Sequence, residues 1–209
     1  MNVKVKICGV TLPSQAREIA ALGADYIGCI IEFSKSPRSA SRVRAKEMKL
    51  EISKFRHVEI VGVVVNMPIH RLTSLIEETG IRVWQLHGNE TPEDVVRIKE
   101  LGVEAWKAVT RENYAQYAAV VDILVVDAMN PLHGAGGSGR NSDWEFAHEL
   151  VEAGYAVVLA GGLTPENVRD GISLVRSSIV DTSSGVEVRP GVKDLSKVSQ
   201  FIASARKNI

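Results

Sequence analysis

Four glycines stand where a helix-like pattern gives way to a strand-like run. They are Gly23, Gly80, Gly102 and Gly154. Glycine reaches the left-handed backbone conformation that closes a helix without a steric penalty, so each junction predicts a helix, a stop and a strand. The glycines are separated by close to one or two times a repeat of about 26 residues, and the chain therefore holds about eight such units.

The runs between these junctions alternate in character. Residues 61–65 and 123–126 are apolar throughout, which is typical of strands buried on both faces of a parallel sheet. The expected strands are residues 3–7, 26–31, 60–65, 82–86, 104–109, 123–126, 156–160 and 178–180. The expected helices are residues 14–22, 44–54, 68–78, 92–101, 142–152, 165–172 and 194–207, with a weaker one near 114–120.

Two helix starts share one signal. Thr91-Pro92 and Thr164-Pro165 each offer an N-cap threonine and a proline at the first helical position. No Asn-Gly or Asp-Gly turn joins two consecutive strands. Eight strands alternating with helices predict an α/β protein, a single-domain (β/α)8 barrel (TIM barrel) over residues 1–209; an open doubly wound sheet is the structural alternative.

The charges of the chain balance. It carries 25 basic and 25 acidic side chains, whereas a general binder of nucleic acid or of anionic membranes needs a basic surplus, so neither partner is expected. Two cysteines without a CxxC pair make no disulfide or redox framework. There is no apolar signal core and no long apolar run, so we expect a cytoplasmic protein without a membrane span.

Polar and reactive residues follow the apolar runs at nearly every strand end. Cys8, His87 and Asp127 follow the first, fourth and sixth expected strands. Because the active site of a (β/α)8 barrel lies at the C-terminal ends of its strands, we expect these side chains to line a polar pocket on one face.

Each candidate has a plainer explanation beside its chemical one. Cys8 is either a small buried hydrophobe or a base or nucleophile, if nearby cations lower its pKa. Asp127 either caps the loop that follows or, with its pKa raised by partial burial, donates a proton. Arg38 is either solvated or clamps a carboxylate. The five histidines are dispersed, so no metal site is expected, and His87 is expected to orient a neighbour.

The last two strands end in small residues. Gly161-Gly162 follows the seventh strand, and Asp181-Thr-Ser183-Ser184-Gly185 ends the eighth. Tight turns explain each alone, but together on neighbouring strands they favour a phosphate site. Residues 134–139 match G-x-G-x-x-G but follow no strand-to-helix turn, so we expect a loop over the pocket there and no dinucleotide site.

Several motifs together resemble the phosphoribosylanthranilate isomerase family along the whole chain. They are Lys6-Ile-Cys-Gly-Val-Thr11, Ser36-Pro-Arg38, Val61-Gly-Val-Val-Val-Asn66, Gln85-Leu-His-Gly88, Gly136-Gly-Ser-Gly139 with Asp143-Trp144, Leu159-Ala-Gly-Gly-Leu163, Asp181-Thr-Ser-Ser-Gly-Val-Glu187 and Gly191-Val-Lys-Asp194. Ser142 stands where the family normally has an aromatic residue.

The resemblance implies an Amadori rearrangement of N-(5-phosphoribosyl)anthranilate, a small phosphorylated substrate, without cofactor or metal. It implies Cys8 as general base, Asp127 as general acid and Arg38, or in its stead Arg42, as the ligand of the anthranilate carboxylate. The remaining substrate-binding residues are expected to be His87, Gly161, Gly162, Asp181, Ser183, Ser184 and Gly185.

Other functions stay open on the residues alone. A pentose-phosphate epimerase resembles a metal-using barrel with histidines ending its second and third strands, where this chain has the Glu32 loop and Asn66. An aminoaldose isomerase of histidine synthesis performs parallel chemistry, and a non-catalytic barrel that binds a phosphorylated metabolite would leave Cys8 and Asp127 idle. The sequence leaves both a monomer and a homodimer open.

Overall fold

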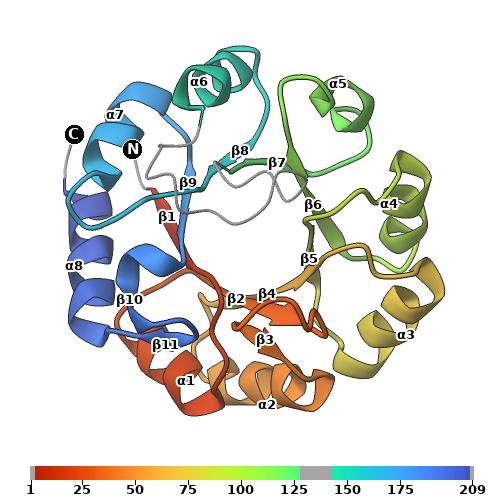
Figure 1. The fold of residues 1–209 in the computed structure, drawn as a ribbon, viewed down its shortest axis with the longest axis horizontal. Coiled ribbons are helices and arrows are strands. Elements are labelled where there is room, and N and C mark those ends of the chain that lie inside the picture. Colours follow the sequence, from red (N-terminus) through yellow and green to blue (C-terminus); the bar gives the residue numbers. More distant parts are fainter. Residues whose placement is uncertain (1–2, 128–142, 208–209) are drawn as a thin grey trace.

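Eight parallel strands close into a barrel in the computed structural model, which describes residues 3–127 and 143–207 (Figure 1). The barrel strands are β1 (Lys4–Ile7), β2 (Tyr26–Ile31), β4 (Glu59–Val64), β5 (Val83–Leu86), β6 (Glu104–Val109), β7 (Ile123–Val126), β8 (Val157–Leu159) and β9 (Ile179–Thr182). Strand β1 pairs with both β2 and β9, with Lys6 opposite Tyr26 and Asp181. The sheet is therefore closed, which confirms the barrel and rules out the open doubly wound alternative.

A ring of helices surrounds the strands (Figure 1). They are α1 (Pro13–Ala21), α2 (Arg42–Ile52), α3 (Ile69–Thr79), α4 (Pro92–Lys99), α5 (Tyr114–Tyr117), α6 (Trp144–Glu152), α7 (Val168–Val175) and α8 (Leu195–Arg206). The four junction glycines have positive φ angles, from 61° at Gly80 to 97° at Gly23. Gly80 is the C-cap of α3 and donates its N–H to Ile76 O at 2.8 Å, as the repeated junction predicts.

The two threonine-proline signals have different outcomes. Thr91 caps α4: its Oγ1 accepts from the N–H of Asp94, whose carboxylate accepts from the N–H of Thr91. The matching prediction for Thr164 is wrong, because α7 begins only at Val168. Asn167 Oδ1 accepts from Thr164 N and its Nδ2 donates to Gly162 O, so these residues close a turn instead of starting the helix.

Four short elements were not expected from the sequence. Strand β3 (Ser39–Ala40) pairs with β2, and η2 (Ser184–Val186) is a single 3-10 turn. Strands β10 (Glu187–Arg189) and β11 (Val192–Lys193) form an antiparallel hairpin. A search for Asn-Gly or Asp-Gly misses this hairpin because its turn is Pro190-Gly191, in which Gly191 has φ 81°.

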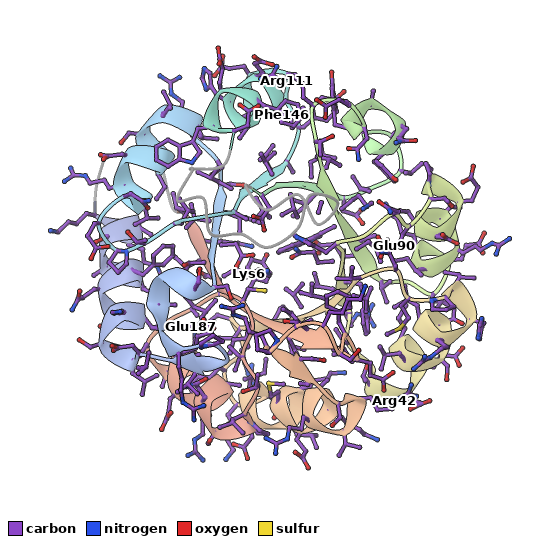
Figure 2. All side chains as sticks on the ribbon, viewed as in Figure 1. Lys6, Arg42, Glu90, Arg111, Phe146 and Glu187 are labelled. Atoms are coloured by element: carbon purple, nitrogen blue, oxygen red, sulfur yellow. The ribbon has the colours of Figure 1, made fainter. Side chains whose placement is uncertain are left out.

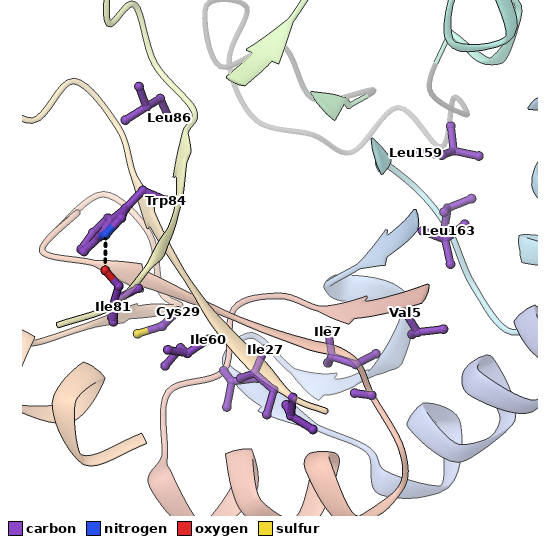
Figure 3. Packing of buried hydrophobic residues seen from close by; sticks show 14 of the residues in the cluster. Val5, Ile7, Ile27, Cys29, Ile60, Ile81, Trp84, Leu86, Leu159 and Leu163 are labelled. Carbon is purple, nitrogen blue, oxygen red and sulfur yellow. Dashed lines mark hydrogen bonds between the residues drawn. The ribbon is translucent and has the colours of Figure 1, made fainter. Parts of the chain in front are cut away.

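The core has two layers, one on each face of the barrel wall. Figure 2 shows side chains inside the ring of strands. The smaller core cluster includes Val61, Val63 and Trp106. Between strands and helices lies the larger layer, where Trp84 is fully buried and donates its indole N–H to Ile81 O at 2.9 Å (Figure 3). Burial on both faces explains why the strands read as unbroken apolar runs.

Within residues 3–127 and 143–207, no helix is both long and apolar enough to cross a membrane.

Candidate active site

The carboxyl ends of the parallel strands meet at one rim of the barrel. Cys8 directly follows β1, Asp127 follows β7 and Asp181 lies in β9. Residues 119 positions apart in the chain thus share one face, because every barrel strand runs in the same direction.

Cys8 is buried at the end of β1, and its N–H donates to Thr182 O at 2.8 Å. A Cβ on Gly28 would lie 2.7 Å from Cys8 Sγ, so the thiol occupies the space that this glycine leaves open. Burial raises the pKa of the Cys8 thiol, while Lys6 and Lys193 act in the opposite direction. Burial prevails, so the thiol form is favoured at neutral pH in the absence of ligand.

A fully buried ion pair lies beside the cysteine. Lys6 Nζ is 2.5 Å from Asp181 Oδ2, and Figure 2 shows Lys6 inside the ring of strands. Burial alone would lower the pKa of Lys6, but Asp181 and Cys8 together hold it above its usual value. Burial raises the pKa of Asp181 against the opposing charge of Lys6. The other carboxylate oxygen, Oδ1, is buried and accepts no hydrogen bond from the described residues.

His87 directly follows β5 and reaches Asp127 across the rim. Its Nε2 is 3.7 Å from Asp127 Oδ2, and its Nδ1 is 2.8 Å from Gln85 Nε2. The Gln85 amide therefore holds the ring with Nε2 facing Asp127. Burial, aided by Lys6 and Lys107, lowers the pKa of His87 to about 4. The imidazole is therefore neutral at physiological pH. That it orients its neighbour stays a prediction.

The two arginines proposed for the carboxylate have different partners. Arg38 Nε and Nη2 donate to Glu187 Oε1 and Oε2 at 2.9 and 2.7 Å, and its side chain is 20% exposed. Arg42 instead binds Glu32 and Glu78 at the start of α2. Arg42 is thus engaged on the outside of the barrel, whereas Arg38 lies against Gly9, next to Cys8.

The loops after β8 and β9 touch. A Cβ on Gly185 would lie 2.1 Å from Leu163 O, and Thr182 Oγ1 donates to that same carbonyl at 2.7 Å. Gly161 and Gly162 adopt φ angles of 81° and 70°, where a side chain would be strained. Backbone from two strands therefore approaches closely at this edge, which is the geometry that phosphate sites in barrels use.

Some expectations lie outside the described residues. The Gly-rich stretch 134–139, expected as a loop over the pocket, and Ser142 both fall between residues 127 and 143. Over the described ranges, no three His, Cys, Asp or Glu side chains gather in a set that could hold a metal ion.

Sequence reasoning missed the buried partners of the site. Lys6, Glu187 and Lys193 are each at most 9% exposed, and none was singled out as a functional residue. The signal for Lys6 is a charge between two apolar residues of a buried strand, Val5 and Ile7. A lysine in that position needs a carboxylate partner.

Comparison with known proteins gives one consistent result. Residues 5–204 match the family model described as N-(5'-phosphoribosyl)anthranilate (PRA) isomerase. The N-(5'-phosphoribosyl)anthranilate isomerase of Aquifex aeolicus is 42% identical, with 96% of this chain and 97% of the relative covered.

Solved structures agree. A phosphoribosyl anthranilate isomerase in complex with reduced 1-(o-carboxyphenylamino)-1-deoxyribulose 5-phosphate is 32% identical, with TM-score 0.82 over 97% of this chain and 98% of that one. Monomers generated from the dimeric enzyme of Thermotoga maritima are 33% identical, with TM-score 0.81 over 97% and 98% of the two chains. That relative thus exists in both oligomeric states.

Proposed function

The chain belongs to the N-(5'-phosphoribosyl)anthranilate isomerase family of intramolecular aldose–ketose isomerases, and we propose that Cys8 and Asp127 carry out the two proton transfers of the reaction. The substrate is N-(5-phosphoribosyl)anthranilate and the product 1-(2-carboxyphenylamino)-1-deoxyribulose 5-phosphate.

The rearrangement needs one acid and one base. The furanose ring oxygen takes up a proton as the ring opens to an iminium ion, and C2′ then loses a proton to give the enolamine that tautomerises to the ketone. Asp127 is the general acid for the first transfer and Cys8 the general base for the second. The rearrangement needs no external oxidant or reductant, because C1′ is reduced as C2′ is oxidised.

One observation supports this assignment: the sulfur and the carboxyl group both lie within electrostatic reach of the same buried ion pair. Lys6 interacts electrostatically with Cys8 and Asp181, and Asp181 in turn with Lys6 and Asp127. A sugar held above the Lys6–Asp181 pair would lie close to both groups.

Because burial raises the pKa of Cys8, the resting enzyme holds a thiol. The base is its thiolate, whose share of the population grows with pH. Lys6 and Lys193 favour that thiolate. Because the reaction needs Cys8 deprotonated and Asp127 protonated, the two populations change in opposite directions with pH, and the pH dependence of kcat should report both groups.

The remaining groups would bind the substrate. Arg38 holds the anthranilate carboxylate by charge-assisted hydrogen bonds. Asp181 Oδ1, buried and without a donor among the described residues, accepts from a ribose hydroxyl, and His87 orients Asp127. The 5′-phosphate lies at the two touching loops, whose residues are Gly161, Gly162, Ser183, Ser184 and Gly185.

The test is the loss of substrate fluorescence in the purified variants Cys8→Ala and Asp127→Asn. Each should lower kcat by about 100-fold or more, as removal of a general acid or base does. Cys29→Ala is the matched control, since this second cysteine is a buried part of β2 on the helix-facing side of the barrel wall, and it should keep kcat.

Wild-type turnover in either active-site variant would overturn the role of the substituted residue. If wild-type protein bound the reduced product analogue yet never converted substrate, it would be a non-catalytic binder.

A further inference from the structure

We propose that Glu187 is a positioning residue that fixes the guanidinium of Arg38 and, through Lys193, joins the carboxylate-binding end of the site to the phosphate loop. This inference rests on the proposed function, in which Arg38 holds the anthranilate carboxylate.

The contact between Glu187 and Arg38 sets the direction of the guanidinium. Its Nε and Nη2 donate to the two carboxylate oxygens in a fork. Of the five N–H groups of an arginine, three remain: two on Nη1 and one on Nη2. One N–H from each of these two nitrogens lies on the terminal edge of the plane, which matches a second planar carboxylate. Glu187 thus presents the other edge of Arg38 in one fixed orientation.

Lys193 prevents the two charges from cancelling. An arginine neutralised by a buried glutamate attracts an anion weakly, but Lys193 Nζ also contacts Glu187 Oε1 at 2.8 Å. The three side chains together carry a net charge of about +1. The Gly191 N–H donates to the same oxygen at 3.1 Å, so the β10–β11 hairpin holds the glutamate in place.

The same lysine reaches the phosphate loop. Lys193 Nζ donates to Ser183 O at 3.0 Å and lies 3.3 Å from Ser183 Oγ. Arg38 and Ser183 meet over Gly9, where an added Cβ would lie 2.7 Å from Arg38 Cδ and 2.9 Å from Ser183 Oγ. The groups proposed for the two ends of the substrate are therefore in one hydrogen-bonded unit beside Cys8.

A double-mutant cycle tests the coupling. Arg38→Ala should raise KM by about 30-fold, and Glu187→Gln by about 10-fold, because the fork to a charged group is lost or weakened. In both, kcat should change by less than about threefold, since neither group transfers a proton. The KM of the double variant should rise by less than the product of the two single increases, because Glu187 acts on the anthranilate carboxylate through the arginine.

Two results would overturn the proposal. One is an unchanged KM in Glu187→Gln; the other is a KM in the double variant that rises by the full product of the two single increases. Glu78→Gln is the matched control, since Glu78 also binds an arginine, Arg42, at 2.8 and 2.9 Å but outside the site. Its KM should equal that of the wild type.

A second variant keeps the test decisive if Glu187→Gln does not fold. Arg38→Lys retains the positive charge at a partly exposed position but cannot form the fork. Its KM should rise nearly as much as in Arg38→Ala, and a wild-type KM would show that orientation is not needed. Wild-type protein without any isomerase activity would refute the proposed function. If the wild type is active but the KM effects of the Arg38 and Glu187 substitutions are independent of each other, only this inference is refuted.

Discussion

Two lysines are fully buried at the active rim, and their environments shift the pKa of the amine in opposite directions. Lys6, in β1, has a raised pKa because Asp181 and Cys8 outweigh the effect of burial. Lys107, in β6, has a lowered pKa because burial outweighs the effect of Glu90. Identical residues with identical burial thus have different electrostatic roles.

The difference lies in how completely each carboxylate partner is satisfied. Glu90 accepts the N–H groups of Asn66 and Gly88 at 2.7 and 2.9 Å and is 3.4 Å from Lys107. Lys107 itself donates to carbonyl oxygens, the closest being Gly88 O at 2.6 Å. The hydrogen bonds of Glu90 and Lys107 thus go to the backbone of neighbouring loops. Asp181, by contrast, keeps a buried oxygen without a donor among the described residues. A buried charge indicates function where hydrogen-bonding capacity is left over.

Removing the amine of Lys6 should have the largest effect. Lys6→Met leaves Asp181 buried without its cation, and breaking such a pair costs about 3–5 kcal/mol of the free energy of unfolding. Urea denaturation measures this loss. The pKa of Cys8 should rise further without Lys6, so kcat at neutral pH should fall as well.

The double variant Lys6→Met/Asp181→Leu is the control for that experiment. It removes both charges and should recover most of the stability without recovering activity. If Lys6→Met were as stable and active as the wild type, Lys6 would have no role in the site that Lys107 lacks.

The pKa of His87 reports on both lysines, because Lys6 and Lys107 each lower it. Its pKa is about 4 in the folded chain and about 6.5 when unfolded. The unfolded chain therefore takes up this proton first as pH falls. The free energy of unfolding should decrease from pH 6.5 to pH 4, by at most about 3 kcal/mol.

Urea denaturation at several pH values measures that decrease, and in His87→Gln this part of the slope should vanish. An unchanged slope in the variant would show that the histidine is solvated in the native protein.

Glu90→Gln should have the smallest effect and separates structure from catalysis. Glutamine has one acceptor oxygen, so one of the two buried N–H groups loses its partner at a cost of about 1–3 kcal/mol. Because Glu90 holds the loop and does not contact the reacting groups, kcat and KM should stay within about threefold of the wild type. A fall in kcat of about 100-fold, the size expected for loss of a proton-transfer group, would mean that both buried lysine sites serve the chemistry.

The sequence predicts local features better than those that depend on distant residues. Strands 26–31, 104–109 and 123–126 agree with β2, β6 and β7 to the residue, because their apolar runs and flanking glycines are local signals. The Thr91 cap is also local and is confirmed. The same pattern fails at Thr164, where Asn167 forms a competing turn.

The site residues likewise differ in whether a local signal or a distant partner identifies them. Cys8, His87 and Asp127 could be singled out because each follows a strand. Glu187 is 149 positions from Arg38, and no periodicity relates the two. Whether Arg38 or Arg42 faces the site depends on such distant partners, which only the closed ring of strands brings together.

The ring closes where the first and last barrel strands meet, since β1 pairs with β9. During synthesis on a ribosome, Lys6 emerges 175 residues before its carboxylate partner, Asp181. A nascent chain therefore carries the cysteine base beside an amine that has no counter-ion, and it cannot assemble the catalytic rim until the last barrel strand docks. Chains that end before β9 would therefore lack both a closed barrel and isomerase activity.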